Sequence, residues 1–227
     1  MTPFISKDPA ALKYLEQLRK YPAIGGLDLS QTTDLTSFVL AWSIKDKVYV
    51  FPWYFLPSDE LQERSYRDAV PYTAWLEAGH VEVCQGSIVD YRYVTERIAA
   101  LASYFDIKEI GYDRNGSRQI VTELSERGIS CVDVNQNMVG LSAAAKRFEE
   151  LVLSRKLVHS GHPVLRWNLD CSTIFTDNGN IKVIKPDLKK STKRIDGIVA
   201  AVIALSRIQK APPVFKSVYA ERGLLTL

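Results

Sequence analysis

The first third of the chain alternates long apolar runs with short polar stretches. Residues 23–30, 36–44 and 48–56 are rich in apolar, β-branched and aromatic side chains, which is typical of β-strands. The connections between these runs are short, and residues 45–47 read Lys-Asp-Lys, a polar turn. Parallel strands need a long crossover, so we predict that these three strands are antiparallel neighbours.

The middle of the chain alternates between strand and helix patterns. Strands are predicted at 81–84, 107–112 and 129–134, and helices at 90–105 and 117–127. This order is typical of parallel strands joined by crossovers. With the first three strands it predicts an α/β fold: a mixed sheet of three antiparallel strands followed by parallel crossover strands, flanked by helices.

Further helices are predicted outside and between these segments, with one more strand near the end. The helices are 9–19, a loosely helical 58–78 with Ser58 as N-cap, 142–156, 163–175 and 194–208; the strand is 181–184, after an Asn-Gly turn at 178–179. The pattern divides the chain into an N-terminal helical extension (1–22), one large domain (23–210) and a C-terminal tail (211–227).

The composition is that of a globular protein with an ordinary core. Of 227 residues, 46% are hydrophobic and 24% are charged. The longest apolar stretches are interrupted by charges before they reach the length of a membrane span, and the first residues do not resemble a signal peptide. We therefore expect an intracellular protein, neither secreted nor membrane-bound. Cys84, Cys131 and Cys171 are odd in number and far apart, which argues against disulfides and structural zinc.

The formal charge of +3 is mild, but basic residues gather at one place. The stretch 185–194 holds five basic residues and one acid, directly before Asp196; they are Lys185, Lys189, Lys190, Lys193 and Arg194. Such a cluster can bind a polyanion even when the whole chain is nearly neutral. The alternative is a solvated basic loop. Either way, this run is the candidate DNA-binding segment.

Three aspartates interrupt segments that are otherwise apolar. Asp28 lies on the first predicted strand, Asp113 at the end of the strand predicted at 107–112, and Asp196 opens the alanine-rich last helix. Burying a bare carboxylate is costly, so each must be paired, protonated or bound to a cation. If the first strand lies beside the first crossover strand, Asp28 and Asp113 are neighbours, and the last helix can pack across them. The three carboxylates would then form a site for hard divalent cations.

Each of these acids also has a purely structural explanation. Asp28 can end a strand and cap a turn, and Asp113 can start a turn. Asp196 can be an early-helix acid favoured by the helix dipole. Asp34, in the first strand connection, is either a fourth, outer acid or a turn residue. The metal hypothesis rests on the joint arrangement.

Histidine and tryptophan positions suggest structure rather than chemistry. His159 and His162 lie in His-Ser-Gly-His-Pro without cysteine partners or an acid at suitable spacing, so we do not predict a zinc site there. The four tryptophans show no stacking pattern like that of single-strand binders and are expected in the core or in helix packing.

Four stretches of the chain, in this order, carry a resemblance to a known family. They are Gly-Gly-Leu-Asp-Leu-Ser at 25–30 with Asp-Leu-Thr at 34–36; Ile-Gly-Tyr-Asp at 110–113; the segments 141–151 and 156–167, after Val-Asn-Gln-Asn at 134–137; and Gly-Asn-Ile-Lys at 179–182 with Arg-Ile-Asp-Gly-Ile-Val-Ala at 194–200. The chain resembles, from about residue 25 to 207, the nuclease domain of tailed-phage terminase large subunits. That domain belongs to the ribonuclease H-like (retroviral integrase-like) group.

The resemblance implies an endonuclease that cuts concatemeric viral double-stranded DNA during genome packaging, in the host cytoplasm. It implies an acidic cluster binding two Mg²⁺ or Mn²⁺ ions, and Asp28, Asp113 and Asp196 match the three metal-binding positions. The family often has an aromatic residue after the second aspartate, whereas Arg114 follows it here. Implied partners are DNA, the packaging ATPase domain of the same full-length protein, the portal and the small terminase subunit.

Hydrolysis of a phosphodiester by two cations needs no protein nucleophile. We expect Asp28 to bridge both ions, with Asp113 and Asp196 each completing one side, and cleavage with little sequence specificity. No G-x-x-x-x-G-K-[ST] phosphate loop occurs, so we expect the nuclease without its ATPase. The alternatives are a junction resolvase or integrase-like nuclease of the same fold, and a non-catalytic module that docks DNA or a portal.

Overall fold

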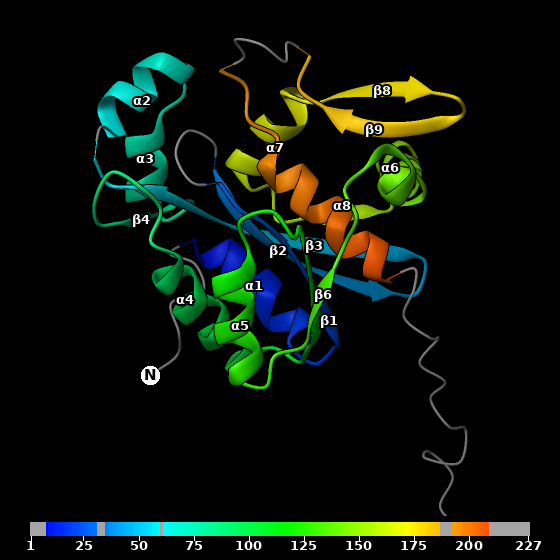
Figure 1. Ribbon diagram of the computed structural model, residues 1–227, viewed down its shortest axis with the longest axis horizontal. Helices are drawn as coiled ribbons and strands as arrows, with labels where there is room; N and C mark the ends of the chain where they lie inside the picture. Colours follow the sequence, from blue (N-terminus) through cyan, green and yellow to red (C-terminus); the bar gives the residue numbers. More distant parts are fainter. Residues whose placement is uncertain (1–7, 31–34, 60, 187–191, 209–227) are drawn as a thin grey trace, which may run out of the picture.

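The computed structural model describes residues 8–30, 35–59, 61–186 and 192–208. Its elements, labelled in Figure 1, are α1 (Pro9–Leu18), β1 (Ala23–Asp28), β2 (Thr36–Ile44), β3 (Lys47–Pro57), α2 (Leu61–Asp68), α3 (Tyr72–Glu77), β4 (Glu82–Cys84), α4 (Tyr91–Tyr104), β5 (Ile107–Tyr112), α5 (Arg118–Glu126), β6 (Cys131–Asp133), α6 (Met138–Leu153), β7 (Leu157–His159), α7 (Pro163–Asp170), β8 (Thr173–Asp177), β9 (Asn180–Ile184) and α8 (Asp196–Ile208).

A mixed sheet forms the centre of the protein. Its strand order is β4-β3-β2-β1-β5-β6, and β7 also pairs with β3. The pairs β1–β2 and β2–β3 are antiparallel, whereas β1–β5 and β5–β6 are parallel. The predicted mixed sheet of three antiparallel strands followed by parallel crossover strands is therefore confirmed, including the placement of β1 beside β5.

Helices cover both faces of this sheet. Buried apolar residues of α1, α4 and α5 pack on one face, and those of α6, α7 and α8 pack on the other. In Figure 1, α8 crosses the sheet obliquely, with α6 beside it. The second of these apolar layers packs α8 against β1 and β2, which makes the start of this helix a well-defined position in the fold.

The first helix is part of the same core. Leu15 and Leu18 of α1 are buried against the sheet, and the Tyr14 hydroxyl donates to the carbonyl oxygens of Val50 (3.2 Å) and Val158 (2.9 Å). The division into extension, domain and tail stays a prediction; residues 209–227 lie outside the described part.

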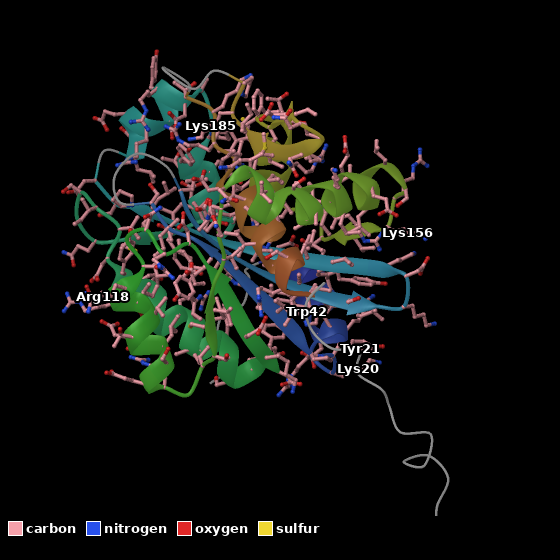
Figure 2. All side chains as sticks on the ribbon, turned by 45° about the vertical axis from the view of Figure 1, so that its right-hand side comes forward. Lys20, Tyr21, Trp42, Arg118, Lys156 and Lys185 are labelled. Atoms are coloured by element: carbon pink, nitrogen blue, oxygen red, sulfur yellow. The ribbon has the colours of Figure 1, made fainter. Side chains whose placement is uncertain are left out.

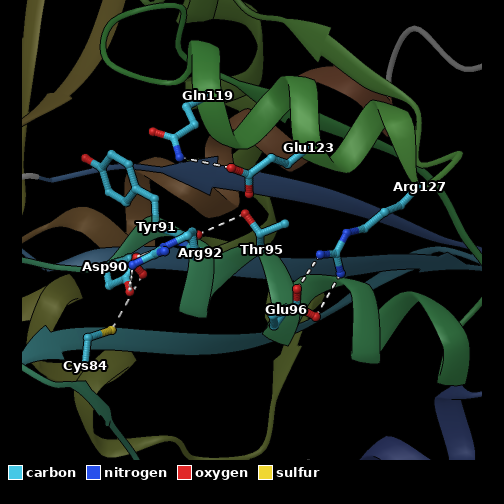
Figure 3. Close-up of polar contacts among 9 residues, drawn as sticks. All are labelled: Cys84, Asp90, Tyr91, Arg92, Thr95, Glu96, Gln119, Glu123 and Arg127. Carbon is cyan, nitrogen blue, oxygen red and sulfur yellow. Dashed lines mark hydrogen bonds and ion pairs between the residues drawn. The ribbon is translucent and has the colours of Figure 1, made fainter.

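The helices α4 and α5 lie side by side on the face of the sheet that α1 also covers, and Figure 3 shows the ion pair between them. Asp90 caps α4 as predicted, since its Oδ1 accepts from the Arg92 amide (2.9 Å). The guanidinium of Arg127, just after α5, is paired with Glu96 of α4, with Nη1 2.8 Å from Oε2. This pair joins the two crossovers at the solvent side.

Some predicted elements differ from the structure. The predicted helix 163–175 ends at Asp170, and Thr173–Asp177 forms β8, which pairs antiparallel with β9. The turn between β8 and β9 has positive φ at Asn178 (46°) and Gly179 (76°), as the Asn-Gly signal indicated. Thr173 to Thr176 are β-branched or aromatic and gain a partner strand, which favours a hairpin over helix.

Two further differences concern strand β7 and residue Ser58. The short strand β7 was not predicted; its three residues become a strand only because β3 offers them an edge. Ser58 was expected to be a helix N-cap, but its hydroxyl accepts from the Gly86 amide (3.1 Å) and so ties β3 to the loop after β4. Both outcomes depend on contacts distant in sequence.

Candidate active site

Asp28 and Asp113 end two neighbouring parallel strands. Asp28 is the last residue of β1, and Asp113 directly follows β5. The pairing of Leu27 with Tyr112 places the two aspartates next to each other at the carboxyl end of the sheet. Side chains alternate between the faces of a strand, so Asp28 shares its face with Gly26 and Asp113 shares its face with Gly111.

Helix α8 lies directly on that face. A Cβ atom added to Gly26 would lie 2.0 Å from the carbonyl oxygen of Ala200, and one on Gly111 would lie 2.9 Å from Cγ2 of Ile203. Glycine at both strands therefore lets the helix approach the sheet closely. Asp196 is the first residue of α8, about one turn before Ala200, and is only 6% exposed.

The start of α8 lies over β3. A Cβ atom on Gly197 would lie 1.9 Å from the Tyr54 hydroxyl oxygen. Tyr54 pairs with Ser37, and Ser37 pairs with Asp28, so these three residues form one row across β3, β2 and β1. Paired residues of antiparallel strands point to the same face. The row thus joins the Asp28 end of the sheet to the start of α8.

The three carboxylates share this end and this face of the sheet, but their side chains are not gathered tightly. Within the described ranges, no three or more His, Cys, Asp or Glu side chains are arranged to hold a metal ion. The Asp113 Oδ1 accepts from the Asn115 amide (3.1 Å), which is the turn geometry weighed above. Like charges repel, and a cation between them offsets that repulsion. The metal role of the three aspartates stays a prediction.

Asn168 holds the backbone on both sides of Asp196. This residue of α7 is fully buried; its Oδ1 accepts from the Gly197 amide (3.0 Å), and its Nδ2 donates to the Arg194 carbonyl (2.9 Å). The acceptor oxygen and the donor nitrogen of this one side-chain amide are therefore both bonded to the backbone, at residues 197 and 194 respectively. The sequence analysis did not single out Asn168, because the contact joins α7 to a segment 29 positions away.

Arg194 is a structural residue in this fold. It is 4% exposed, and its Nη2 lies 3.2 Å from Oδ1 of Asp68 in α2, whose side chain is 1% exposed. The Tyr72 hydroxyl donates to the other oxygen of Asp68 (3.0 Å). The expected role of Arg194 as a surface contact to DNA does not fit this burial; it anchors the segment before α8 to α2 instead.

Removing the carboxylate of this buried pair should destabilise the protein. Asp68→Ala removes the carboxylate that lies 3.2 Å from the buried Arg194 guanidinium, and removing one partner of a buried pair costs about 3–5 kcal/mol. Denaturant unfolding measures this loss. The control is Glu150→Ala, which removes an exposed i,i+3 pair with Arg147 and should cost less than about 1 kcal/mol. Equal losses in the two variants would contradict the structural role.

The remaining basic and acidic candidates are only partly within the described structure. Lys185 directly follows β9, and Lys193 is exposed just before α8. Figure 2 shows Lys185 at the upper end of the molecule, opposite Lys20 and Tyr21. Lys189, Lys190 and Asp34 lie outside the described residues, so their expected roles stay predictions.

A polar cavity that the sequence analysis missed opens beside Asp113. It has a volume of about 560 Å³ and is lined by Asp113, Arg114, Asn115, Asp133, Val134, Asn135, Gln136, Asn137 and Lys182. Lys182 Nζ donates to the Gln136 carbonyl (2.8 Å), and Arg114 is paired with Asp133 (2.5 Å). The amide-rich segment 134–137 was noted in the sequence, but nothing there showed that it faces Asp113.

His162 and the tryptophans are structural. His162 packs against the rings of Phe51 (5.6 Å), Tyr54 (5.5 Å) and His80 (5.0 Å), and burial lowers its pKa to about 3, so it is neutral. Trp42 and Trp53 are buried in the core, and Trp75 and Trp167 pack on each other at 5.5 Å, as expected.

Comparison with known proteins shows the family of this chain. The chain matches the family model described as the endonuclease domain of the terminase large subunit over residues 15–211. It is 33% identical over 212 residues to the terminase large subunit of Enterobacteria phage HK97, covering 90% of this chain and 41% of that protein. The chain thus spans less than half the length of this relative.

Solved structures agree with the sequence comparison. The crystal structure of the HK97 bacteriophage large terminase matches with a TM-score of 0.75 at 30% identity, over 90% of this chain and 43% of that one. The large terminase nuclease of thermophilic phage G20c with bound magnesium matches in fold, with a TM-score of 0.54 at 10% identity, over 83% of this chain and 82% of that one. Among the described residues, no helix has the length and apolarity of a membrane span. The chain has the ribonuclease H-like fold predicted for it and belongs to the family of terminase large subunit endonuclease domains.

Proposed function

We propose that this nuclease domain is a metal-dependent endonuclease that cuts concatemeric viral double-stranded DNA during genome packaging. The observation that carries the proposal is the placement of Asp28, Asp113 and Asp196 at the ends of β1 and β5 and the start of α8, on one face of the sheet. Three acids on one face at one end of the sheet repel one another, and a bound cation would offset that repulsion.

The donor set fits Mg²⁺ or Mn²⁺. Both ions prefer oxygen ligands, and Mg²⁺ keeps several waters, so few carboxylates suffice. The G20c nuclease, similar in fold, has been crystallised with magnesium and with cobalt. Two ions, when bound, supply an activated water and charge stabilisation at the phosphate and leaving oxygen. In this proposal Asp28, Asp113 and Asp196 would hold the ions, Asp28 contacting both and Asp113 and Asp196 one each.

The surroundings of the acids suit a DNA strand. Lys185 follows β9 and Lys193 lies just before α8 in the chain. Lys189 and Lys190 belong to the same basic run. The polar cavity beside Asp113 offers amide and lysine donors to phosphate oxygens and sugars. Contacts of this kind position the backbone without reading bases, so we propose cleavage with little sequence specificity.

The proposed setting follows from the relatives. The HK97 relative is a terminase large subunit of more than twice the matched length. We therefore propose that the domain acts together with the packaging ATPase domain of one longer protein, in the cytoplasm of the infected host, with portal and small terminase subunit as partners.

Plasmid cleavage tests the activity. The protein with Mn²⁺ should convert supercoiled plasmid to nicked and linear forms, and EDTA should stop the reaction. Asp196→Asn should lose the activity, whereas Asp106→Asn should keep it, because Asp106 is an exposed acid paired with Lys108 at the opposite end of β5. Equal cutting by the wild type and Asp196→Asn would refute the proposal, and a strong preference for four-way junctions would favour a resolvase.

A further inference from the structure

Two buried hydroxyl groups lie between Asp28 and Asp196 without an assigned role. Ser37 is 0% exposed and Tyr54 is 1% exposed. Neither the Ser37 Oγ nor the Tyr54 hydroxyl has a hydrogen-bond partner within the part of the chain that the structure describes. A buried hydroxyl without a partner costs free energy, so a pair of them at one place calls for an explanation.

The register of the sheet shows where these hydroxyls point. Asp28 pairs with Ser37, and Ser37 pairs with Tyr54, so all three side chains leave the sheet on the face that α8 covers. Directly opposite residues of an antiparallel pair have Cβ atoms about 4.5–5.5 Å apart, which puts the Ser37 hydroxyl within reach of the Asp28 carboxylate.

The Tyr54 hydroxyl reaches the start of α8. Its oxygen lies where a side chain on Gly197 would begin, next to Asp196. A tyrosine hydroxyl carries one O–H donor, so this group can donate a hydrogen bond to a neighbouring carboxylate.

We propose that Ser37 and Tyr54 are positioning residues for the metal site: their hydroxyls donate to the carboxylates of Asp28 and Asp196, respectively, and hold the other carboxylate oxygens toward the cations. This inference rests on the proposed function. Metal-binding carboxylates are commonly held by such outer hydrogen bonds, whose loss weakens metal affinity about 10–100-fold. The proposal accounts for both buried hydroxyls, because each would gain a carboxylate as its hydrogen-bond partner.

The test measures Mn²⁺ affinity by calorimetry and the melting temperature without metal. Tyr54→Phe and Ser37→Ala should each weaken Mn²⁺ binding about 10–100-fold, and each should keep or raise the metal-free melting temperature, because each removes a buried hydroxyl without a partner. Ser37→Thr keeps the hydroxyl and should restore most of the affinity. A merely structural role would not move metal affinity.

Two control variants remove hydroxyls that have hydrogen-bond partners and lie elsewhere in the fold, one partly buried and one buried. Tyr14→Phe loses the bonds to Val50 and Val158, and Ser206→Ala loses the bond to the Ile203 carbonyl (2.7 Å). Both should lower the melting temperature and leave Mn²⁺ affinity unchanged.

The outcomes separate this inference from the proposed function. If the wild type binds Mn²⁺ and cuts plasmid, and both Tyr54→Phe and Ser37→Ala bind Mn²⁺ as tightly as the wild type, only the positioning role is overturned. A wild type that binds no Mn²⁺ overturns both.

Discussion

Replacing Asp28 with Asn should abolish most DNA cleavage while leaving the fold intact. Asn has the shape of Asp but lacks the negative charge, and Asp28 is the acid proposed to contact both cations. Metal ions contribute several kcal/mol of transition-state stabilisation, and about 1.4 kcal/mol corresponds to a tenfold rate change. We therefore expect plasmid cleavage with Mn²⁺ to fall at least about a hundredfold, and further than in Asp113→Asn or Asp196→Asn.

Circular dichroism and the melting temperature provide the control for folding. Asp28 lies at the end of a strand whose other residues are buried, so Asn at this position should not disturb the apolar core. Cleavage by a folded Asp28→Asn protein at more than a tenth of the wild-type rate would contradict the bridging role. A larger loss of cleavage in Asp113→Asn than in Asp28→Asn would assign the bridging role to Asp113.

Replacing Gly26 with Ala should destabilise the whole domain. The added methyl carbon would lie 2.0 Å from the Ala200 carbonyl oxygen and 2.7 Å from the Ala204 amide nitrogen. Both are backbone atoms of α8, so the clash is relieved only by moving the helix off β1. Overpacking of a core costs about 1–3 kcal/mol when side chains can adjust, and we expect at least about 3 kcal/mol here.

Gly25→Ala is the matched comparison, on the same strand but the opposite face. Its Cβ would meet only side chains, Cγ1 of Ile110 and Cε2 of Phe38, both at 2.9 Å. Side chains can shift, so its cost should be about 1–2 kcal/mol. Denaturant unfolding of both variants measures the difference. A Gly26→Ala protein as stable as Gly25→Ala would mean that α8 does not lie on β1 as closely as described.

Much of the sheet could be predicted because its signals are local. The apolar runs of β1, β2 and β3 and their short connections require antiparallel pairing, and the Asp90 cap marks the start of α4. The sequence predicts helix for residues 173–175, because their strand character shows only beside β9. Strand pairing is a contact between distant segments, and a single run of residues carries little information about it.

The candidate site shows the same limit. The sequence pointed to Asp28, Asp113 and Asp196, because acids in apolar segments stand out and the order of motifs resembles a family. It also pointed to Arg194, which the fold buries against Asp68, 126 positions away. A lysine or arginine on a solvated loop and one in a buried pair look alike in sequence.

The sequence by itself determined where strand and helix patterns alternate, where the chain direction reverses, and which acids interrupt the apolar runs. These features depend on neighbours along the chain. Only the tertiary structure decided that Asn168 holds both sides of Asp196 and that Ser37 and Tyr54 lie in one row with Asp28. Strand register and helix packing set these contacts, and both are fixed by the burial of whole faces rather than by any single segment.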